Sequence, residues 1–170
     1  MEKKILIVDD QKLTREFLID ALSTKYEVSE AQDLAETLEA VEKDSFDVIL
    51  TDVKMNDKDE GLELLKVLHK RGIKSTVIVM TGYASIEQAT EAMRLGAYDY
   101  IEKPFTVDEI KIKLEKAFEY SSLRDENKQL KRKLNISRGK EIIGFSAKLK
   151  EILKTVDMIA DTRATVLITG

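Results

Sequence analysis

The sequence of 170 residues contains no cysteine, no tryptophan, one histidine and one proline. Without cysteine the chain can form neither a disulfide nor a thiolate metal site. The single histidine, His69, excludes metal centres with several imidazole ligands and argues against histidine-based catalysis. No charge-free apolar stretch is long enough to cross a membrane, and residues 1–4 lead directly into a run of strand length rather than into a signal peptide. We therefore expect a cytoplasmic protein that contacts no membrane.

Positive charge is not in excess either, because 32 acidic residues outnumber 28 basic ones and leave a net charge of -4. This balance provides no general basic surface, so we expect no nucleic acid contact from this chain. With 43% hydrophobic residues, the length suffices for one domain with a well-buried core and some additional chain.

Short apolar runs alternate with segments of helical periodicity through the first two thirds of the sequence. The apolar runs cover residues 5–8, 26–28, 48–50, 76–80 and 98–101. The segments between them have apolar residues at helical spacing, for example Phe17, Ala21 and Leu22. Strict alternation predicts right-handed βαβ crossovers and a parallel sheet covered on both faces. The predicted fold is a doubly wound α/β domain that ends near residue 118.

The residues at the carboxyl ends of the predicted strands carry the functional signal, because ligands of such folds bind at that edge. The first run is followed by Asp9 and Asp10, the third ends in Asp52, the fourth in Thr81, and the fifth is followed by Lys103 and Pro104. Three acids, a hydroxyl and a lysine are therefore expected to meet at one edge of the sheet.

Three neighbouring carboxylates repel one another, so they either hold protons or bind a cation. Oxygen ligands without histidine or cysteine favour a hard ion, and Mg²⁺ is the natural choice for a site at Asp9 and Asp10. Asp52 at a strand end can act as a nucleophile toward a phosphoryl group and form an acyl phosphate. Lys103 would neutralise the phosphoryl oxygens, and the Thr81 hydroxyl would bond to one of them.

Each residue alone has a simpler interpretation. Asp9 or Asp10 could cap the helix that starts near Gln11, Thr81 could belong to a turn, and Lys103 could be a solvated charge. Their common position at one end of the sheet favours the joint site. A cis peptide bond before Pro104 would aim Lys103 inward.

Together these residues resemble the motif of the receiver domain of two-component response regulators, and the resemblance covers residues 3 to about 118. It implies a flavodoxin-like five-stranded sheet of order 2-1-3-4-5 and transfer of a phosphoryl group from a histidine kinase to Asp52. It also implies Mg²⁺ held by Asp10, Asp52, the backbone carbonyl of Lys54 and waters anchored by Asp9. The switch residue of the family falls on Tyr100, which would turn inward as Thr81 moves toward the phosphate.

The loop after Asp52 departs from the family pattern. Met55 is followed by Asn56 instead of proline, and Gly61 lies nine positions after Asp52 instead of eight. We expect one inserted residue to reshape the loop 56–60 and to affect the Mg²⁺ geometry at the Lys54 carbonyl. In the family, the positions of Lys54 and Tyr83 control the access of hydrolytic water, and two bulky residues there predict a long-lived acyl phosphate.

A long helical pattern begins at Thr106, a candidate N-cap, and continues without proline or glycine to about Ile136. Its first part suits the receiver core, whereas residues 119–137 show heptad spacing. The a and d positions are Tyr120, Leu123, Asn127, Leu130 and Leu134, and the g-to-e′ pairs are Glu119 with Arg124 and Glu126 with Lys131. This pattern predicts a parallel homodimer through a coiled-coil linker. A solvated linker helix is the alternative, because the seam spans barely two heptads.

Residues 138–170 resemble the opening of the AAA+ ATPase domain in sigma-54-dependent activators of the nitrogen-regulator class. The residues 142–146, an amphipathic segment and an apolar run at 166–169 carry this resemblance, and Gly170 falls where the phosphate loop of that domain would begin. No complete nucleotide site is expected within these residues, so we expect no enzyme activity from them. The resemblance implies a parent protein that acts on sigma-54 RNA polymerase and DNA.

Two other classes compete with a phosphorylated receiver. A hydrolase of the haloacid dehalogenase type would need its nucleophile in an Asp-x-Asp motif on the first strand, and Asp9-Asp10-Gln11 has the wrong spacing. A pseudo-receiver that serves only as an unphosphorylated dimerisation module would usually lack an acid or the lysine, and here all are present.

Overall fold

The computed structural model describes residues 3–82, 86–137, 146, 151, 152 and 154. Five parallel strands form one sheet in the order β2-β1-β3-β4-β5, as predicted. The strands are β1 (Lys4–Val8), β2 (Glu27–Ala31), β3 (Val48–Asp52), β4 (Thr76–Thr81) and β5 (Asp99–Glu102). Tyr83, the side chain of Leu134 and the predicted ATPase fragment 138–170, apart from four isolated residues, lie outside the described part of the chain.

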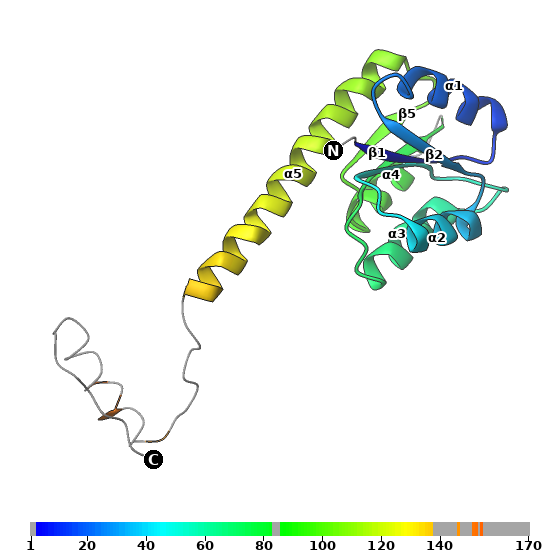
Figure 1. The fold of residues 1–170 in the computed structure, drawn as a ribbon. Coiled ribbons are helices and arrows are strands. Elements are labelled where there is room, and N and C mark those ends of the chain that lie inside the picture. The colour runs from blue at the N-terminus through cyan, green and yellow to red at the C-terminus, as the bar shows by residue number, and fades with distance from the viewer. Residues whose placement is uncertain (1–2, 83–85, 138–145, 147–150, 153, 155–170) are drawn as a thin grey trace. The chain divides into compact units, whose positions relative to one another are not determined.

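Five helices connect and follow these strands in the described residues. They are α1 (Lys12–Leu22), α2 (Leu34–Lys43), α3 (Glu60–Lys70), α4 (Ile86–Arg94) and α5 (Val107–Ser137). Figure 1 shows the sheet between two layers of helices, with α1 and the start of α5 on one face and α2, α3 and α4 on the other. Of the described helices, none has the combination of length and apolar character needed to cross a bilayer.

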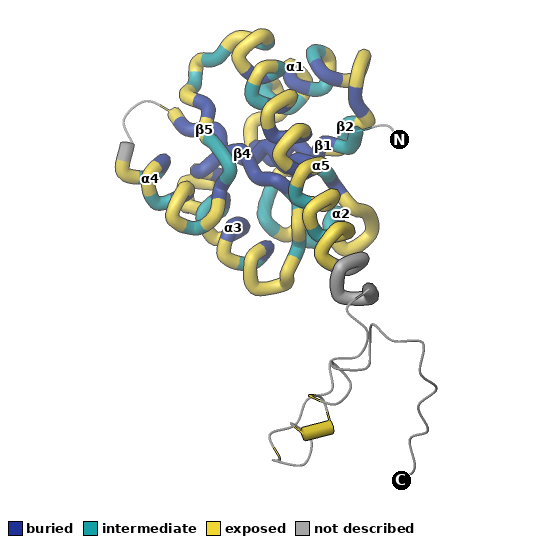
Figure 2. The backbone as a smooth tube through the Cα atoms, turned by 90° about the vertical axis from the view of Figure 1, so that its left-hand side faces the viewer, coloured by how far each residue is buried: buried dark blue, intermediate teal, exposed yellow. Residues whose placement is uncertain are grey.

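The core consists of two apolar clusters, one on each face of the sheet, and β1 contributes to both. Ile5 and Ile7 pack with the cluster under α1 and α5, whereas Leu6 and Val8 pack with the cluster under the other three helices. Because side chains alternate along a strand, a strand buried on both faces needs a continuous apolar run. Figure 2 shows the buried strands inside a shell of half-exposed helices.

Helix α5 begins with a capping box at Thr106, the predicted N-cap. The backbone nitrogen of Glu109 donates to the Thr106 hydroxyl at 3.3 Å, and the Glu109 carboxylate accepts from the Thr106 backbone nitrogen at 2.8 Å. The buried face of the helix consists of Ile110, Leu114, Ala117, Phe118 and Ser121. Contact with the receiver therefore continues past residue 118, and the compact unit that contains the sheet extends to Lys128.

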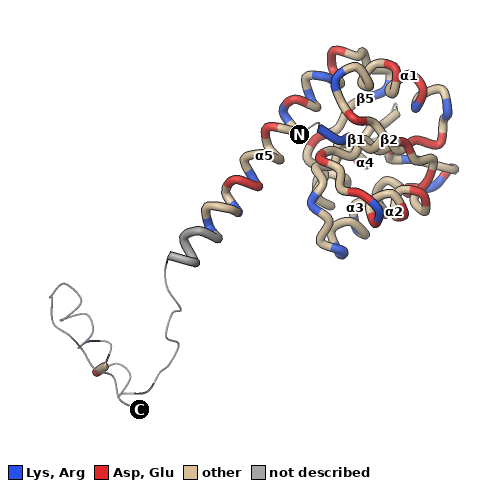
Figure 3. The backbone as a smooth tube through the Cα atoms, in the orientation of Figure 1, with Lys and Arg blue, Asp and Glu red and all other residues tan. Residues whose placement is uncertain are grey.

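Part of the predicted dimer seam contacts the receiver itself. The Tyr120 ring lies 4.9 Å from the Tyr98 ring, and the Arg124 guanidinium lies over Tyr120 and donates to the Lys74 carbonyl. Leu123 and Leu130 are 57% and 51% exposed, and Asn127 is exposed as well. Figure 3 shows charged residues of both signs along the same helix.

Candidate functional site

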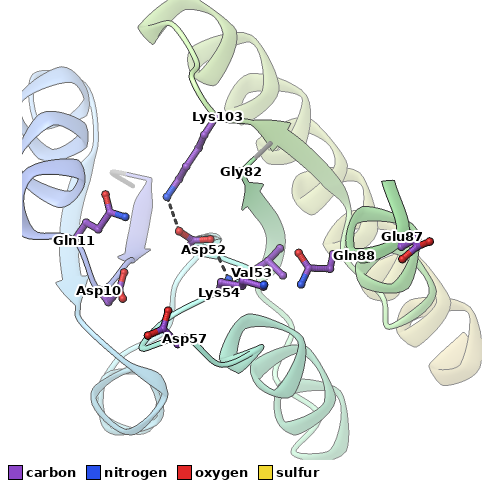
Figure 4. Close-up of a pocket in the computed structure, with 10 residues that line it drawn as sticks. All are labelled: Asp10, Gln11, Asp52, Val53, Lys54, Asp57, Gly82, Glu87, Gln88 and Lys103. Atoms are coloured by element: carbon purple, nitrogen blue, oxygen red, sulfur yellow. Dashed lines mark hydrogen bonds and ion pairs between the residues drawn. The ribbon is translucent and has the colours of Figure 1, made fainter. Parts of the chain in front are cut away.

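Strand register places the predicted residues at one edge of the sheet. Val8 is aligned with Thr51, and Asp52 with Met80, so the turn after β1 lies beside the end of β3. A pocket of about 520 Å³ opens at this edge. It is lined by Asp10, Gln11, Asp52, Val53, Lys54, Asp57, Gly82, Glu87, Gln88 and Lys103 (Figure 4). The carboxyl ends of the parallel strands thus form a polar cavity, as the fold class predicts.

Lys103 joins two of the acids. Its Nζ atom donates to Asp9 Oδ2 at 2.7 Å and to Asp52 Oδ2 at 2.5 Å. Asp9 is completely buried and Asp52 is 7% exposed, so this ammonium group pairs with carboxylates that have little access to water. The Lys103-Pro104 peptide bond is cis, and Figure 4 shows the lysine side chain pointing from the end of β5 to Asp52.

Backbone amides hold the three carboxylates in place. Asp9 Oδ1 accepts from the nitrogen of Gln11 at 2.8 Å, Asp52 Oδ1 from Lys54 at 3.1 Å, and Asp10 Oδ2 from Asn56 at 2.9 Å. The interaction of Asp9 at the start of α1 is the capping role considered above, and it coexists with the Lys103 pair. One oxygen of each of the three carboxylates is therefore oriented by a backbone N–H group.

The same three acids fit a hard divalent cation. One carboxylate oxygen from each of Asp9, Asp10 and Asp52 lies within 4.8 Å of the others. Both Asp9 oxygens already accept hydrogen bonds, whereas Asp10 is exposed and has a described donor only at Oδ2. Asp10 is therefore the most available of the three acids as a direct ligand, since both Asp52 oxygens accept hydrogen bonds as well, and oxygen donors of this kind suit Mg²⁺.

Burial and pairing shift the protonation equilibria of the central pair. Burial raises the pKa of Asp52 above its ordinary value, and the hydrogen bond and charge of Lys103 offset only part of this effect. Burial alone would lower the pKa of Lys103, but the hydrogen bonds and charges of Asp52 and Asp9 outweigh it and raise that pKa. The lysine is therefore a permanent cation at neutral pH.

The extra residue after Asp52 is accommodated in a tight reverse turn. The backbones of Met55 and Lys58 exchange hydrogen bonds of 3.0 and 2.9 Å, and Asn56 and Asp57 between them have φ angles of 52° and 59°. Two consecutive residues with positive φ between paired residues are typical of a type I′ turn. This turn brings the Asn56 amide to Asp10 and places Asp57 in the pocket lining.

Gly61 fixes the distance between α3 and the end of β3. A Cβ atom at this position would lie 2.1 Å from the carbonyl oxygen of Asp52 and 2.8 Å from Val53 Cα. The Gly61 nitrogen donates to the Val53 carbonyl at 3.0 Å. Only glycine allows this close approach, so the position of Asp52 depends on a residue outside the pocket.

The two predicted switch residues lie on neighbouring strands, Thr81 at the end of β4 and Tyr100 within β5. Thr81 is buried, and its hydroxyl donates to the Gly82 carbonyl at 3.3 Å. Tyr100 is 44% exposed, with the Lys113 ammonium 5.6 Å from its ring centroid. Tyr100 is thus partly exposed to solvent, and its inward turn stays a prediction.

Two residues near the site, Arg15 and Gln88, were not found from the sequence. Arg15 on α1 donates to the carbonyl oxygens of Asp9 and Asp10, and Gln88 on α4 donates to Asp59 at 2.8 Å. No periodicity or motif points to them, because their partners are brought together only by the folded chain. A cation one turn into the helix after the acid pair is the one sequence signal that Arg15 offers.

Comparison with known proteins agrees with this geometry. The family model of the response regulator receiver domain matches residues 5–115. The regulatory protein AtoC of Escherichia coli is 34% identical over 98% of this chain and 36% of its own length. The nitrogen assimilation regulatory protein NtrX of Azorhizobium caulinodans is 30% identical over 100% of this chain and 37% of its own length. The chain therefore spans little more than a third of these relatives.

Solved structures give the same result. A crystal structure of NtrX from Brucella abortus superposes with a TM-score of 0.75 at 30% identity, covering 95% of this chain and 35% of that one. A CheY-like receiver domain protein from Methanospirillum hungatei superposes with a TM-score of 0.68 at 33% identity, covering 73% of this chain and 99% of that one. The chain belongs to the response regulator receiver domain family and is related along its full length to regulators of the sigma-54-dependent activator class.

Proposed function

We propose that Asp52 accepts a phosphoryl group from a phosphohistidine of a sensor histidine kinase. The observation that carries the proposal is the Lys103 ammonium between Asp9 and Asp52, at a pocket edge that Asp10 also lines. A nucleophilic carboxylate, a fixed cation and a pair of acids able to hold a divalent ion are the groups that phosphoryl transfer to an aspartate requires. Their convergence supports this function over a purely structural role.

The proposed transfer is a displacement at the phosphorus atom of the phosphohistidine. An oxygen of Asp52 forms a bond to phosphorus while the bond between phosphorus and the imidazole nitrogen breaks, and the electron pair stays on that nitrogen, which takes up a proton. The product is an acyl phosphate at Asp52 and a free histidine on the kinase. Burial raises the pKa of Asp52, and the hydrogen bond and charge of Lys103 offset part of this rise, so Lys103 favours the ionised, nucleophilic form of the carboxylate.

Mg²⁺ would be held by Asp10, Asp52 and the Lys54 carbonyl, with Asp9 anchoring its waters, and would supply charge neutralisation for the phosphoryl oxygens. Lys103 can donate to one of these oxygens from its present position near Asp52. The Thr81 hydroxyl lies at the end of the adjacent strand and can donate to another. These contacts favour a conformer in which Thr81 approaches the phosphate and Tyr100 turns inward, so phosphorylation shifts a population.

The test is incubation with acetyl phosphate and Mg²⁺ followed by intact mass measurement. We expect the protein to gain one phosphoryl group, Asp52→Asn to gain none, and Asp57→Asn, a matched change in the same pocket, to gain one. Continuous release of phosphate with no stable adduct would instead indicate a hydrolase. Absence of any adduct or turnover would indicate a pseudo-receiver that only dimerises.

We further propose that the parent protein is a cytoplasmic, two-component transcription regulator in which this receiver controls an ATPase acting on sigma-54 RNA polymerase at DNA. The names of the relatives, which include a regulatory protein and a nitrogen assimilation regulatory protein, support a regulatory role. The control would be exerted through a change in the arrangement of a receiver homodimer.

The exposed residues Leu123, Asn127 and Leu130 on α5 support a parallel dimer seam. Sedimentation should show a dimer at high protein concentration, and Leu123→Asp should shift it to monomer. Asn127→Ile should strengthen the dimer, because a buried polar residue at an a position costs stability while it fixes the register. A monomer at all concentrations would exclude the seam.

A further inference from the structure

Arg15 makes three hydrogen bonds, two to the backbone of Asp9 and Asp10 and one to the side chain of Glu30. One terminal nitrogen donates to the carbonyl oxygen of Asp9 at 2.7 Å and to that of Asp10 at 3.3 Å. The Nε atom donates to the Glu30 carboxylate on β2 at 2.7 Å. The Arg15 side chain is only 11% exposed, although it starts from the first turn of α1 at the surface of the domain.

These two carbonyls lie in a stretch of backbone that secondary structure does not hold. Strand β1 ends at Val8, the last rung of its ladder is the bond from the Asp9 nitrogen to the Ala31 carbonyl, and α1 begins at Lys12. The peptide groups of Asp9 and Asp10 therefore depend on another donor for their orientation. Guanidinium offers several N–H donors in a fixed plane, which suits two successive carbonyls and a carboxylate at once.

The direction of the two acid side chains follows from these peptide planes. Asp9 must point inward to reach Lys103, while Asp10 must point into the pocket beside Asp52. A rotation of the peptide between them would move both carboxylates relative to Asp52. Glu30 on β2 holds the guanidinium in place. Arg15 with its bonds to Glu30 and to the Asp9 and Asp10 carbonyls, here called the clamp, therefore connects β2, α1 and the acid pair.

We propose that Arg15 is a positioning residue for the divalent cation, acting through the backbone of Asp9 and Asp10 and held by Glu30. The inference rests on the proposed function, because it concerns the same Mg²⁺ site. Partners that orient metal ligands without touching the metal typically change metal affinity about 10- to 100-fold when they are removed. We expect an effect in this range for Arg15→Met.

The sign of the effect distinguishes positioning from simple electrostatics. A cationic side chain near an acidic cluster repels a divalent cation, so loss of its charge alone would tighten Mg²⁺ binding. Loss of the clamp would weaken binding, because the acids would no longer share one geometry. Arg15→Lys keeps the charge but cannot reproduce the planar set of donors, so positioning predicts weaker binding for this variant too.

Lys12→Met provides the matched control on the same helix. Lys12 is 78% exposed on its side chain and pairs with Glu16 one turn further along α1. The substitution removes one positive charge close to the acid pair without changing any bond to the Asp9 or Asp10 carbonyls. We expect its Mg²⁺ dissociation constant to stay within about twofold of the parent value, since exposed charges interact weakly.

Calorimetric titration with Mg²⁺ measures the dissociation constants of the parent protein, Arg15→Met, Arg15→Lys, Glu30→Gln and Lys12→Met. We expect the parent to bind, Arg15→Met to bind about tenfold or more weakly, and Arg15→Lys and Glu30→Gln to lie between them. Because Glu30→Gln leaves α1 and the acids intact, it tests the clamp even if Arg15→Met fails to fold.

A second readout separates positioning from general damage to the fold. With acetyl phosphate as donor, the Mg²⁺ concentration for half-maximal labelling of Asp52 should rise in Arg15→Lys and Glu30→Gln, while the labelling rate at saturating Mg²⁺ should remain near that of the parent. Parent protein that binds no Mg²⁺ would overturn the proposed function itself. Parent protein that binds Mg²⁺, with Arg15 and Glu30 variants that bind it equally well or more tightly, would overturn only the role of Arg15.

Discussion

Replacement of Lys103 by methionine should destabilise the unphosphorylated receiver strongly in the absence of Mg²⁺. The ammonium lies 2.7 Å from Asp9 Oδ2 and 2.5 Å from Asp52 Oδ2, and the lysine side chain is 21% exposed. At an effective dielectric constant of about 20, each pair has a gross Coulomb energy of about 6 kcal/mol, most of which offsets the cost of desolvating the charges. Breaking such a pair leaves buried charge uncompensated and typically costs about 3–5 kcal/mol. We expect about 3 kcal/mol, because partial exposure lets water reach the cluster.

The assay is urea unfolding at pH 7 without Mg²⁺, with Lys12→Met as the control for loss of an exposed lysine. The control should change the free energy of unfolding by less than about 0.5 kcal/mol. Mg²⁺ should recover part of the loss in Lys103→Met, because a cation bound only by the folded state stabilises it.

The dependence on pH gives a further test with a definite sign. The raised pKa of Lys103 means that its contribution is fully present below its ordinary pKa of 10.5 and is lost only as the pH rises through the folded value. Without the lysine, ionised Asp52 has no compensation for burial, and protonation as the pH falls toward its ordinary pKa of 3.8 removes that cost. The deficit should therefore shrink between pH 7 and about pH 4. A deficit below about 1 kcal/mol at pH 7, or one independent of pH, would refute the reasoning.

Three further predictions concern the same edge of the sheet. Gly61→Ala should lower the free energy of unfolding by about 3 kcal/mol, because its Cβ would meet the Asp52 carbonyl. Gly82→Ala is the control and should change this free energy by less than about 0.5 kcal/mol, because a Cβ there would have nothing within 4 Å and Gly82 has no positive φ. Equal effects of the two substitutions in urea unfolding would contradict the role given to Gly61. Asp52→Asn should raise the melting temperature at pH 7, because the raised pKa of Asp52 means that its ionised form costs stability above the folded pKa. The gain in melting temperature should fade toward about pH 4. A lower melting temperature of Asp52→Asn at pH 7 would contradict this prediction. Lys54→Ala and Tyr83→Ala should each shorten the lifetime of the acyl phosphate by exposing it to water, and a phosphate-loss time course in which neither variant is faster would exclude this role.

The sheet and the acid cluster were predictable because both follow from the local pattern. The run from Ile5 to Val8 is continuously apolar, which indicates burial on both faces and hence a parallel sheet. Once the strands are parallel, the residues that follow them must gather at one edge, so the proximity of Asp9, Asp52 and Lys103 needed no further information.

What the sequence did not reveal depends on the path of the chain between elements. Arg15 acts on main-chain carbonyls whose direction is set only when β1 has ended and α1 has begun. The residue inserted before Gly61 was recognisable, but the turn at Asn56 and Asp57 lacks the glycine that usually marks type I′ geometry. Phe17 has helical spacing and yet is 45% exposed, because Leu18 and Leu22 form the inward face of α1.

The heptad pattern of α5 predicts a dimer surface but does not show at which residue that surface begins. Tyr120 occupies the first predicted a position, and its ring is already in contact with Tyr98 of the same receiver. Arg124, the predicted partner of Glu119 across the dimer, instead donates to the Lys74 carbonyl. A pattern of residue types cannot distinguish contact with a second chain from contact with the chain's own domain, since both favour the same apolar spacing.

The central claim is that the carboxylate of Asp52, and no other acid at this edge, forms the phosphoryl bond. The most direct measurement is treatment of the acetyl phosphate and Mg²⁺ product with borohydride, which reduces an acyl phosphate of aspartate to homoserine, followed by peptide mass mapping. We predict homoserine at position 52 alone, with Asp9, Asp10 and Asp57 unchanged. Homoserine at any of these other positions, or unmodified Asp52 in protein that has gained phosphate, would contradict the account.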